Sequence, residues 1–285
     1  MGDTPDQKVV VDEQWKQYDW KRRVLINALG EERARAWARP VNLVEATLKN
    51  QLTPFGRANR NYIKRFANIH AGKRCVIIGN GPSLKETSLD LLRSEFTFGL
   101  NRIYLMFDEL GFDTTYHVVI NRFVVEQCAS DFQRLKSPLF TTITNRDLLG
   151  DGNSVGYLNR IAGPWFSRDA SRGICEGYTV TYVAMQLAYY MGFSEVILVG
   201  VDHKFAVQGK PNQLVESTGA DASHFDPRYF AQGFKWQLPD LDNSEISYTL
   251  ARDMFERSGR RIVDATVGGA LDIFPKVQLE QILSR

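Results

Sequence analysis

The feature that most constrains the fold is a short apolar run that ends in a glycine-rich turn. Cys75–Ile78 is apolar at every position, as expected of a strand that is buried on both faces of a sheet. The turn Gly79-Asn80-Gly81-Pro82-Ser83 follows it, and a helical pattern then runs to about Arg93. A strand, a glycine turn and a helix in this order are typical of an α/β fold with a parallel sheet.

The chemistry of this turn favours an anion, although through neither standard phosphate-binding motif. Glycines tolerate positive φ angles and allow a ligand to approach the backbone. Pro82 suits a first helical turn, and the amides at a helix N-terminus attract phosphate. However, Leu84 stands where the dinucleotide-binding fingerprint has its third glycine, and Lys85-Glu86 does not fit the P-loop. A ligand-binding loop and a plain strand–helix turn both remain open.

Further apolar runs alternate with helical patterns along the chain. This alternation predicts an α/β fold, a mostly parallel Rossmann-like sheet with helices on both faces. The expected strands are Cys75–Ile78, Phe96–Leu100, Tyr116–Ile120, Leu139–Ile143, Glu195–Gly200 and Arg261–Val263, and the expected helices are Thr179–Met191 and Asn243–Ser258. Residues 147–176 and 202–242 look irregular, and loops of this length are typical of lids and binding loops.

The N-terminal part differs from the rest in charge. Residues 1–74 hold 15 Lys/Arg against 8 Asp/Glu, although the net charge of the whole chain is +2. We expect an N-terminal helical extension over residues 1–69, with helices near Asp12–Ala28 and Glu31–Ala38, and a catalytic α/β domain over residues 70–285. Two interpretations remain open: the extension packs on its own domain or on a second copy of the chain, or its basic residues contact an anionic membrane surface.

Composition excludes several classes of protein. A hydrophobic fraction of 44% supplies a core, and 24% charged residues argue against a disordered chain. A net charge of +2 argues against a dedicated nucleic-acid binder. No apolar run reaches the ~18 residues that a membrane span needs, and the polar N-terminus does not resemble a signal peptide. Cys75, Cys128 and Cys175 cannot all pair, which fits a reducing cytoplasm.

Two asparagines follow predicted strands, at the edge where ligands bind in open α/β sheets. Asn101 comes after Phe96–Leu100, and Asn121 comes after Tyr116–Ile120. A side-chain amide there can hydrogen-bond a base or a sugar hydroxyl, or it can cap a turn or helix. The sequence does not decide between these two roles.

The four histidines divide into two groups. His70 and His117 lie beside or within predicted strands and are expected to be structural. His203 follows Asp202 and precedes Lys204 at the end of a predicted strand, where an acid can orient a neighbour or hold a ribose and an ammonium can neutralise phosphate. His224 lies in a long loop, and an imidazole titrates near neutral pH, which suits a general base. A loop histidine also fits a structural role.

Standard metal and nucleophile signatures are absent from the sequence. It contains no HExxH, CxxC or GxSxG pattern. Asp240-Leu241-Asp242 has the form of a DxD metal motif, but it follows a proline and opens a predicted helix, so helix capping is the better interpretation. We therefore expect no metal site.

Four ordered motifs together resemble a known family. They are CVIIGNGPSLK at Cys75–Lys85, FGLNRIY at Phe98–Tyr104, the long segment Tyr178–Lys204, and Ser223-His224-Phe225. This set resembles the MptE-like superfamily, which is similar to the bacterial sialyltransferases of glycosyltransferase family 42 and to the motility accessory factor glycosyltransferases. WQLPDLD at Trp236–Asp242 and DATVGGALDIFPKV at Asp264–Val277 resemble MptE-like proteins of surface-polysaccharide clusters. The resemblance covers roughly residues 70–285 and implies a sialyltransferase-like variant of the GT-A fold.

The resemblance also implies roles for individual residues. In the sialyltransferases the glycine turn, the strand-end asparagines and the start of the long helix hold the CMP part of a CMP-sugar. The nucleotide-binding residues would then be Gly79, Asn80, Gly81, Pro82, Ser83, Asn101, Asn121, Thr179, Val180 and Asp202. The family's general base matches His224. We expect Lys204, together with His203 or Arg228, to stabilise the departing phosphate. Lys204 stands where the family has a tyrosine, and Val180 where it has a serine.

These observations lead to one expected function and two alternatives. We expect a cytoplasmic, metal-independent, inverting glycosyltransferase without a cofactor, which moves a sialic-acid-like or Kdo-like sugar from a CMP donor to a surface glycan or glycoprotein. The superfamily also contains 6-hydroxymethyl-7,8-dihydropterin pyrophosphokinases, which use ATP and Mg²⁺ and share the glycine turn. A non-catalytic nucleotide-binding module is the third class. Self-association and peripheral membrane contact through the basic N-terminal region are further expectations.

Overall fold

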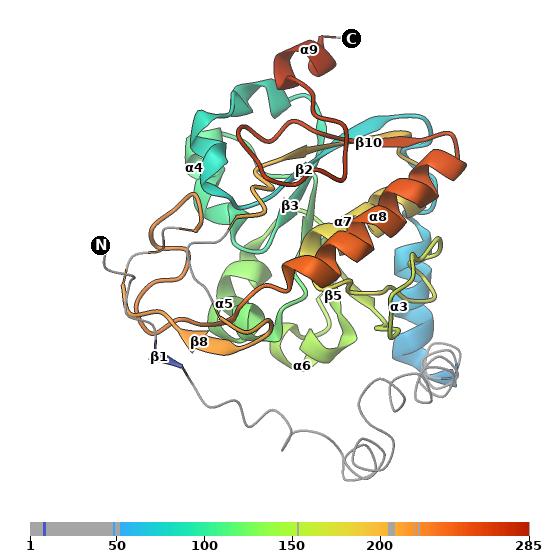
Figure 1. The fold of residues 1–285 in the computed structure, drawn as a ribbon. Helices are drawn as coiled ribbons and strands as arrows, with labels where there is room; N and C mark the ends of the chain where they lie inside the picture. Colours follow the sequence, from blue (N-terminus) through green and yellow to red (C-terminus); the bar gives the residue numbers. More distant parts are fainter. Residues whose placement is uncertain are drawn as a thin grey trace, which may run out of the picture.

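The computed structural model describes residues 8–9, 48, 52–152, 154–204, 209–219, 221 and 223–284 of the chain. The helices expected near 12–28 and 31–38 lie outside these residues. Within them, the polypeptide forms a seven-stranded sheet with helices on both faces and a small three-stranded sheet (Figure 1). The chain is therefore of the α/β class with a Rossmann-like sheet, as the sequence predicts.

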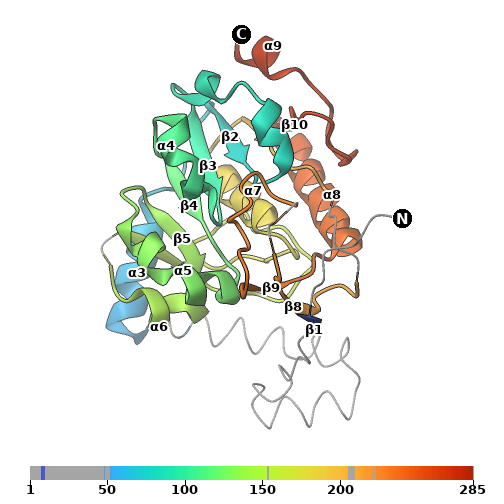
Figure 2. The same ribbon diagram turned by 90° about the vertical axis from the view of Figure 1, so that its left-hand side faces the viewer.

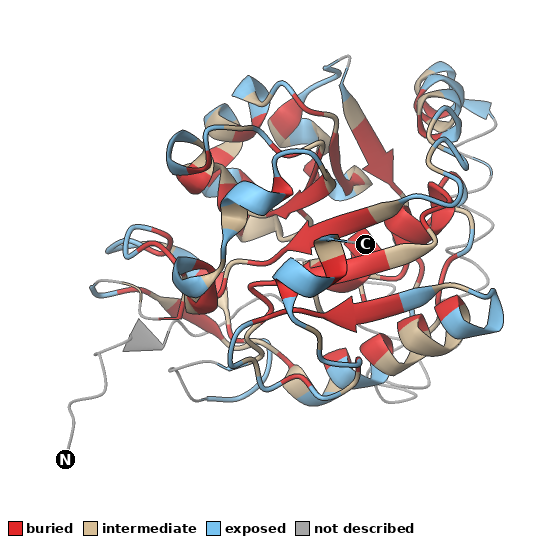
Figure 3. Ribbon diagram, turned by 90° about the horizontal axis from the view of Figure 1, so that it is seen from above, coloured by how far each residue is buried: buried red, intermediate tan, exposed pale blue. Residues whose placement is uncertain are grey.

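The large sheet has the order β10-β7-β2-β3-β4-β5-β6, and every neighbouring pair is parallel. Its strands are β2 Arg74–Ile78, β3 Phe96–Leu100, β4 Tyr116–Val118, β5 Leu139–Thr142, β6 Val155–Leu158, β7 Glu195–Val199 and β10 Arg261–Asp264. Nearly all positions of β2, β3 and β7 are buried, which explains their unbroken apolar sequences. Figure 3 shows this buried layer between exposed helix surfaces.

Helices cover both faces of the large sheet. The α-helices are α3 Pro54–Lys64, α4 Phe107–Leu110, α5 Arg122–Arg134, α6 Arg146–Leu149, α7 Val180–Tyr190, α8 Leu241–Arg257 and α9 Leu279–Leu283. The 3₁₀ turns are η2 Pro82–Glu86, η3 Leu89–Leu92, η4 Ile103–Met106 and η5 Ile143–Asn145. Helices α7 and α8 lie on one face and α4 and α5 on the other (Figures 1 and 2).

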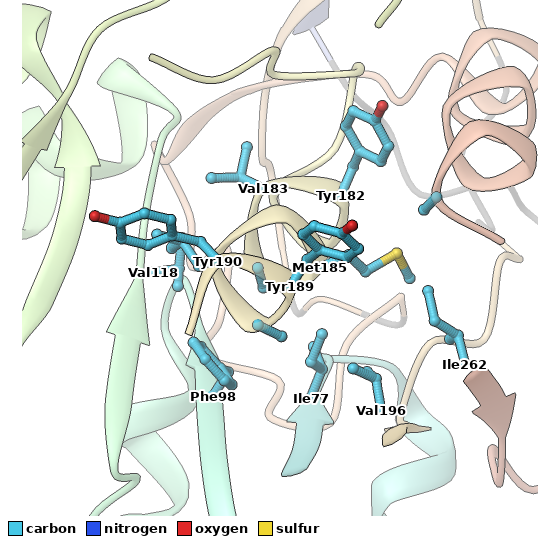
Figure 4. Packing of buried hydrophobic residues seen from close by; sticks show 14 of the residues in the cluster. Ile77, Phe98, Val118, Tyr182, Val183, Met185, Tyr189, Tyr190, Val196 and Ile262 are labelled. Atoms are coloured by element: carbon cyan, nitrogen blue, oxygen red, sulfur yellow. The ribbon is translucent and has the colours of Figure 1, made fainter. Parts of the chain in front are cut away.

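Alternating residues of β2 explain how two cores form from one sheet. Cys75 and Ile77 point to the α7 face, whereas Val76 and Ile78 point to the α4–α5 face. Helix α7 is buried at nearly every position, and Figure 4 shows it lying over Ile77 and the neighbouring strands. Because α7 ends at the amino edge of the sheet, where β7 begins, its N-terminus lies at the carboxyl edge.

Helix α3 belongs to this core, although it lies within the predicted extension. The Asn59 amide donates to the Tyr157 carbonyl at 2.8 Å, and the Tyr157 N–H donates back to Asn59 Oδ1 at 2.9 Å. Since Tyr157 lies on the edge strand β6, these two bonds satisfy backbone groups that an edge strand otherwise leaves open.

Two parts of the structure differ from the sequence-based expectation. The prediction of a helix after the glycine turn is wrong. Two 3₁₀ turns, η2 and η3, form there instead, because Thr87 between them adopts an extended conformation with ψ 134°. The segments that look irregular contain β6, β8 and β9, and the last two pair with β1 in a small antiparallel sheet of order β1-β8-β9. Its strands are β1 Lys8–Val9, β8 Leu214–Glu216 and β9 Lys235–Gln237. The loop between β8 and β9 carries His224.

Candidate nucleotide-binding and catalytic site

The predicted site residues gather at the point where the strand order reverses. From β2 the chain adds β3, β4, β5 and β6 on one side of the sheet, and then β7 and β10 on the other. The carboxyl ends of β2 and β7 therefore flank the topological switch point, the usual ligand crevice in open α/β sheets. The glycine turn follows β2, and Asp202, His203 and Lys204 follow β7.

The two loops at this switch point are pressed together. The Gly79 and Gly81 N–H groups donate to the carbonyls of Val199 and Gly200, at 2.8 and 2.9 Å. A Cβ on Gly79 would lie 2.2 Å from the Gly200 oxygen, and one on Gly81 would lie 1.6 Å from Asp202 Oδ2. Neither glycine has a positive φ. Glycine is therefore required here for contact between two loops, and not for an unusual backbone conformation.

Asp202 fixes the glycine turn. Its Oδ2 accepts a hydrogen bond from Ser83 Oγ at 2.7 Å, and its Oδ1 accepts one from the Ser83 N–H at 3.2 Å. Burial raises the pKa of Asp202, and the bonds from Ser83 partly offset that effect. Of the two roles that the sequence leaves open for Asp202, the structure shows the one in which it orients a neighbour. Pro82 begins η2, which is too short to supply a helix dipole.

Asn80 and Asn101 present buried oxygens at the ends of the neighbouring strands β2 and β3. Neither Asn80 Oδ1 nor Asn101 Oδ1 has a hydrogen-bond partner among the described residues. A buried acceptor without a partner costs about 1–3 kcal/mol. A ligand that donates hydrogen bonds from an amino or hydroxyl group would satisfy both oxygens, so these two side chains are the best candidates for ligand contact.

Asn101 is held in place by His117. The His117 Nε2–H donates to the Asn101 carbonyl at 2.6 Å, and Asn101 has a φ of 45°. Burial lowers the pKa of His117 to about 4, so the ring is neutral at pH 7. His70 forms a 2.6 Å hydrogen bond with the Tyr116 hydroxyl and stacks on Phe193. His117 is buried and His70 is half-buried among aromatic rings, so both histidines have structural contacts, as expected.

Asn121 and Thr179 both cap helices. Asn121 Oδ1 accepts from the Phe123 N–H at 2.9 Å and begins α5, so capping is the role that the structure shows. Thr179 Oγ1 accepts from the Thr181 N–H at 3.3 Å and begins α7, whose first residue is Val180. Asp240 likewise caps α8, which confirms the capping interpretation of the DxD-like motif.

His203 and Lys204 contact the segments on the β10 side of the site. The His203 Nε2–H donates to Glu245 Oε1 of α8 at 2.9 Å, and His203 has a φ of 55°. Lys204 Nζ donates to the Gly268 carbonyl at 2.9 Å. His203 and Lys204 are thus fixed by different segments from those that hold His224.

The loop between β8 and β9 brings His224 to the glycine turn. The Phe225 N–H donates to the Asn80 carbonyl at 3.0 Å. The His224 ring stacks on Tyr229, with 3.9 Å between ring centroids and 6° between planes, and its Nδ1 lies 2.6 Å from Asp221 Oδ2. The structure therefore places His224 one residue away from a direct contact with the predicted nucleotide loop.

Arg102 and Tyr229 tie the same loop to β3, and sequence reasoning missed both. Arg102 Nη1 donates to the carbonyls of Arg228 and Tyr229, and its guanidinium lies 5.1 Å from the Phe234 ring centroid. Burial raises the pKa of Tyr229, while bonds from Arg102 and the Asn101 side chain oppose the shift. The contacts therefore run from Asn101 through Tyr229 to His224.

A pattern of asparagines was also missed. Each strand from β2 to β6 is followed within three residues by an asparagine: Asn80, Asn101, Asn121, Asn145 and Asn159. Asn145 is fully buried, and its amide donates to the Thr141 hydroxyl at 2.9 Å. The signal in the sequence was the recurrence of this residue type at strand ends.

Metal-binding clusters and membrane-spanning helices are both absent from the described residues. Over this part of the chain, no three His, Cys, Asp or Glu side chains lie close enough together to hold a metal ion. No helix within the described ranges combines the length and apolar character of a membrane span. The cysteines Cys75, Cys128 and Cys175 are buried thiols.

Comparison with known proteins gives a matching family and solved structures that are similar to this chain. No curated protein matches the chain. The solved structure of the MAf glycosyltransferase from Magnetospirillum magneticum AMB-1 is similar over 77% of this chain, with 15% identity and a TM-score of 0.47, and the chain spans 38% of that protein. Residues 49–208, more than half of the chain, match the family described as 6-hydroxymethylpterin diphosphokinase MptE-like. The chain therefore belongs to this MptE-like family, as its motifs predict.

Proposed function

We propose that the protein is an inverting glycosyltransferase that moves a sialic-acid-like or Kdo-like sugar from a CMP donor to a surface glycan or glycoprotein. The nucleotide would lie in the crevice between β2 and β7, against Asn80 and Asn101. His224 would be the general base, and Lys204, with His203, would stabilise the departing phosphate. No metal is assigned a role in this reaction.

The observation that carries the proposal is the contact between the loop of His224 and the glycine turn. The hydrogen bond from the Phe225 N–H to the Asn80 carbonyl joins the residue after His224 to the turn that carries one of the two unsatisfied amide oxygens. A transferase needs this combination, because the acceptor hydroxyl must lose its proton close to the bound donor.

The proposed reaction forms one bond and breaks one bond at the anomeric carbon of the sugar. The acceptor oxygen forms a bond to the anomeric carbon, and its proton passes to His224 Nε2. The bond between the anomeric carbon and the phosphate oxygen breaks, and CMP leaves with the electron pair. Lys204 uses one N–H in its bond to Gly268, so its ammonium has two further donors for the phosphate.

Membership of the family favours a second candidate, a 6-hydroxymethyl-7,8-dihydropterin pyrophosphokinase that uses ATP and Mg²⁺. The matched residues 49–208 contain the glycine turn, Asn101 and Asp202. They end before Asp221 and His224, so the family match covers the nucleotide crevice and not the histidine loop. A pyrophosphokinase would release AMP, whereas the proposed transferase releases CMP.

A panel of nucleotides separates these candidates. The melting temperature is measured with CMP, CDP, UDP, ATP and GDP, because a ligand at about 100 Kd stabilises the fold by about 2.7 kcal/mol. A shift with CMP that exceeds the shift with ATP supports the transferase, and CMP release from a CMP-sugar with an acceptor completes the test. A shift with ATP and Mg²⁺ alone, with AMP released in the presence of hydroxymethyldihydropterin, would replace our proposal with the pyrophosphokinase.

A further inference from the structure

The carboxylate of Asp221 divides its two oxygens between the loop backbone and His224. Oδ1 accepts a hydrogen bond from the Ser223 N–H at 2.8 Å, which closes a tight turn. Oδ2 lies 2.6 Å from His224 Nδ1. Both side chains are largely buried, with 7% of Asp221 and 11% of His224 exposed. The turn therefore fixes the carboxylate before it meets the imidazole.

The ring of His224 is fixed in its plane and position by other contacts. Tyr229 stacks on one face at 3.9 Å, and Phe230 meets the ring edge-on at 4.8 Å. The hydrogen bond from Phe225 to Asn80 anchors the next residue. Of the contacts described here, the bond to Asp221 is the one that selects which ring nitrogen carries the hydrogen.

We infer that Asp221 is a positioning residue that sets the tautomer of His224. A carboxylate accepts hydrogen bonds and donates none, so Nδ1 must carry the hydrogen. Nε2 then holds the lone pair that takes the proton of the acceptor hydroxyl. When Nε2 is protonated, the Asp221 carboxylate stabilises the resulting imidazolium. The catalytic meaning of this arrangement rests on the proposed function, whereas the tautomer itself does not.

Asp226 is a matched control within the same loop. Its Oδ1 accepts from the Arg228 N–H at 2.7 Å, so it closes a turn of the same kind. Its second oxygen accepts from the Arg228 guanidinium at 2.6 Å and not from His224. Asp226→Asn therefore changes a turn carboxylate in the same way without changing the partner of the imidazole.

The tautomer is measured by NMR on protein labelled with ¹⁵N-histidine at pH 9, where an ordinary imidazole is neutral. The chain has only four histidines, and His224→Gln assigns the signal. We expect the hydrogen on Nδ1 in the wild type and in Asp226→Asn. In Asp221→Asn the side-chain amide can donate to Nδ1, so the hydrogen moves to Nε2. A wild-type ring protonated on Nε2, or an unchanged ring in Asp221→Asn, would overturn the inference.

Kinetics provide the second readout. Asp221→Asn should lower kcat by about 10²–10⁴-fold, as loss of the base itself does, with the KM for the donor within about twofold of the wild type. The kcat of Asp226→Asn should stay within about threefold of the wild-type value. When His224 is already replaced by alanine, Asp221→Asn should cause no further loss of kcat. A loss of kcat as large as the one that Asp221→Asn causes in the wild type would contradict the inference. If none of the proteins transfers a sugar, the proposed function fails, and the NMR result still decides the role of Asp221.

Discussion

The backbone N–H of Phe225 lies 3.0 Å from the carbonyl oxygen of Asn80 and donates to it, which joins the loop between β8 and β9 to the turn after β2. Asn80 follows a strand of the large sheet, whereas Phe225 lies in the loop between two strands of the small sheet. This bond joins the two parts of the proposed site, the turn whose amide oxygen would face a ligand and the loop whose imidazole would act on it.

The first prediction concerns the base. His224→Ala should lower the rate of sugar transfer by about 10²–10⁴-fold, the usual contribution of general-base catalysis. The Kd for CMP should change by less than about threefold, because Asn80 and Asn101 remain. Rates come from CMP release and affinities from calorimetry. Wild-type turnover in this variant would remove His224 from the base role.

The second prediction concerns the orphaned oxygen of Asn80. Asn80→Ala removes a buried acceptor without a described partner, so the free energy of unfolding should not fall. The affinity for CMP should fall by about tenfold, which corresponds to about 1.4 kcal/mol. Urea denaturation and calorimetry measure the two quantities.

Asn145→Ala is the control for Asn80→Ala. Asn145 also follows a strand and also has a buried oxygen without a described partner, but its amide donates to the Thr141 and Thr142 hydroxyls. This variant should be less stable than the wild type and should bind CMP normally. The assignment of Asn80 fails if both variants show the same pattern.

The third prediction concerns the contact between the loops after β2 and β7. Gly81→Ala places a methyl group 1.6 Å from Asp202 Oδ2, and the two bonds to Ser83 oppose any movement of that carboxylate. The fold should lose about 1–3 kcal/mol of stability, and CMP binding should weaken with it. In Gly152→Ala the nearest atom lies 3.6 Å away, so this control should remain stable. Equal stability of the two variants in urea would contradict the packing described here.

The fourth prediction concerns pH. Burial lowers the pKa of His117 to about 4, below the ordinary value of 6.5. The unfolded chain therefore binds a proton more readily than the folded chain, and stability falls as the pH falls from about 6.5 to about 4. The loss from this group is about 3 kcal/mol. His117→Gln should therefore lose less stability than the wild type between pH 7 and pH 4.5, as measured by urea denaturation. An identical pH dependence of stability in the two proteins would refute the lowered pKa of His117.

The sequence predicts the apolar strands of the large sheet better than it predicts β6 and the strands of the small sheet. Strands β2, β3 and β7 are apolar on both faces and were expected within one residue of their bounds. Strand β6 was missed because its sequence contains a glycine and lies in a segment without a clear strand pattern. Strands β8 and β9 have three residues each, and their pairing depends on contacts between distant segments.

Only part of the candidate site could be predicted, because some of its contacts join segments that are distant in the sequence. Local pattern and family resemblance identify Asn80, Asn101 and His224, which the structure brings together. The role of Gly81 could not be predicted, because its neighbour Asp202 comes from the other side of the switch point. The partner of His224 lies only three residues away, so the spacing of Asp221 and His224 was a signal that sequence reasoning overlooked.

A crystal structure of the protein with CMP tests the central claim most directly. The account predicts cytidine or ribose groups within hydrogen-bond distance of Asn80 Oδ1 and Asn101 Oδ1, with the phosphate in the crevice between β2 and β7 and the His224 ring facing it. A nucleotide bound elsewhere on the molecule, or an empty crevice at saturating CMP, would contradict it.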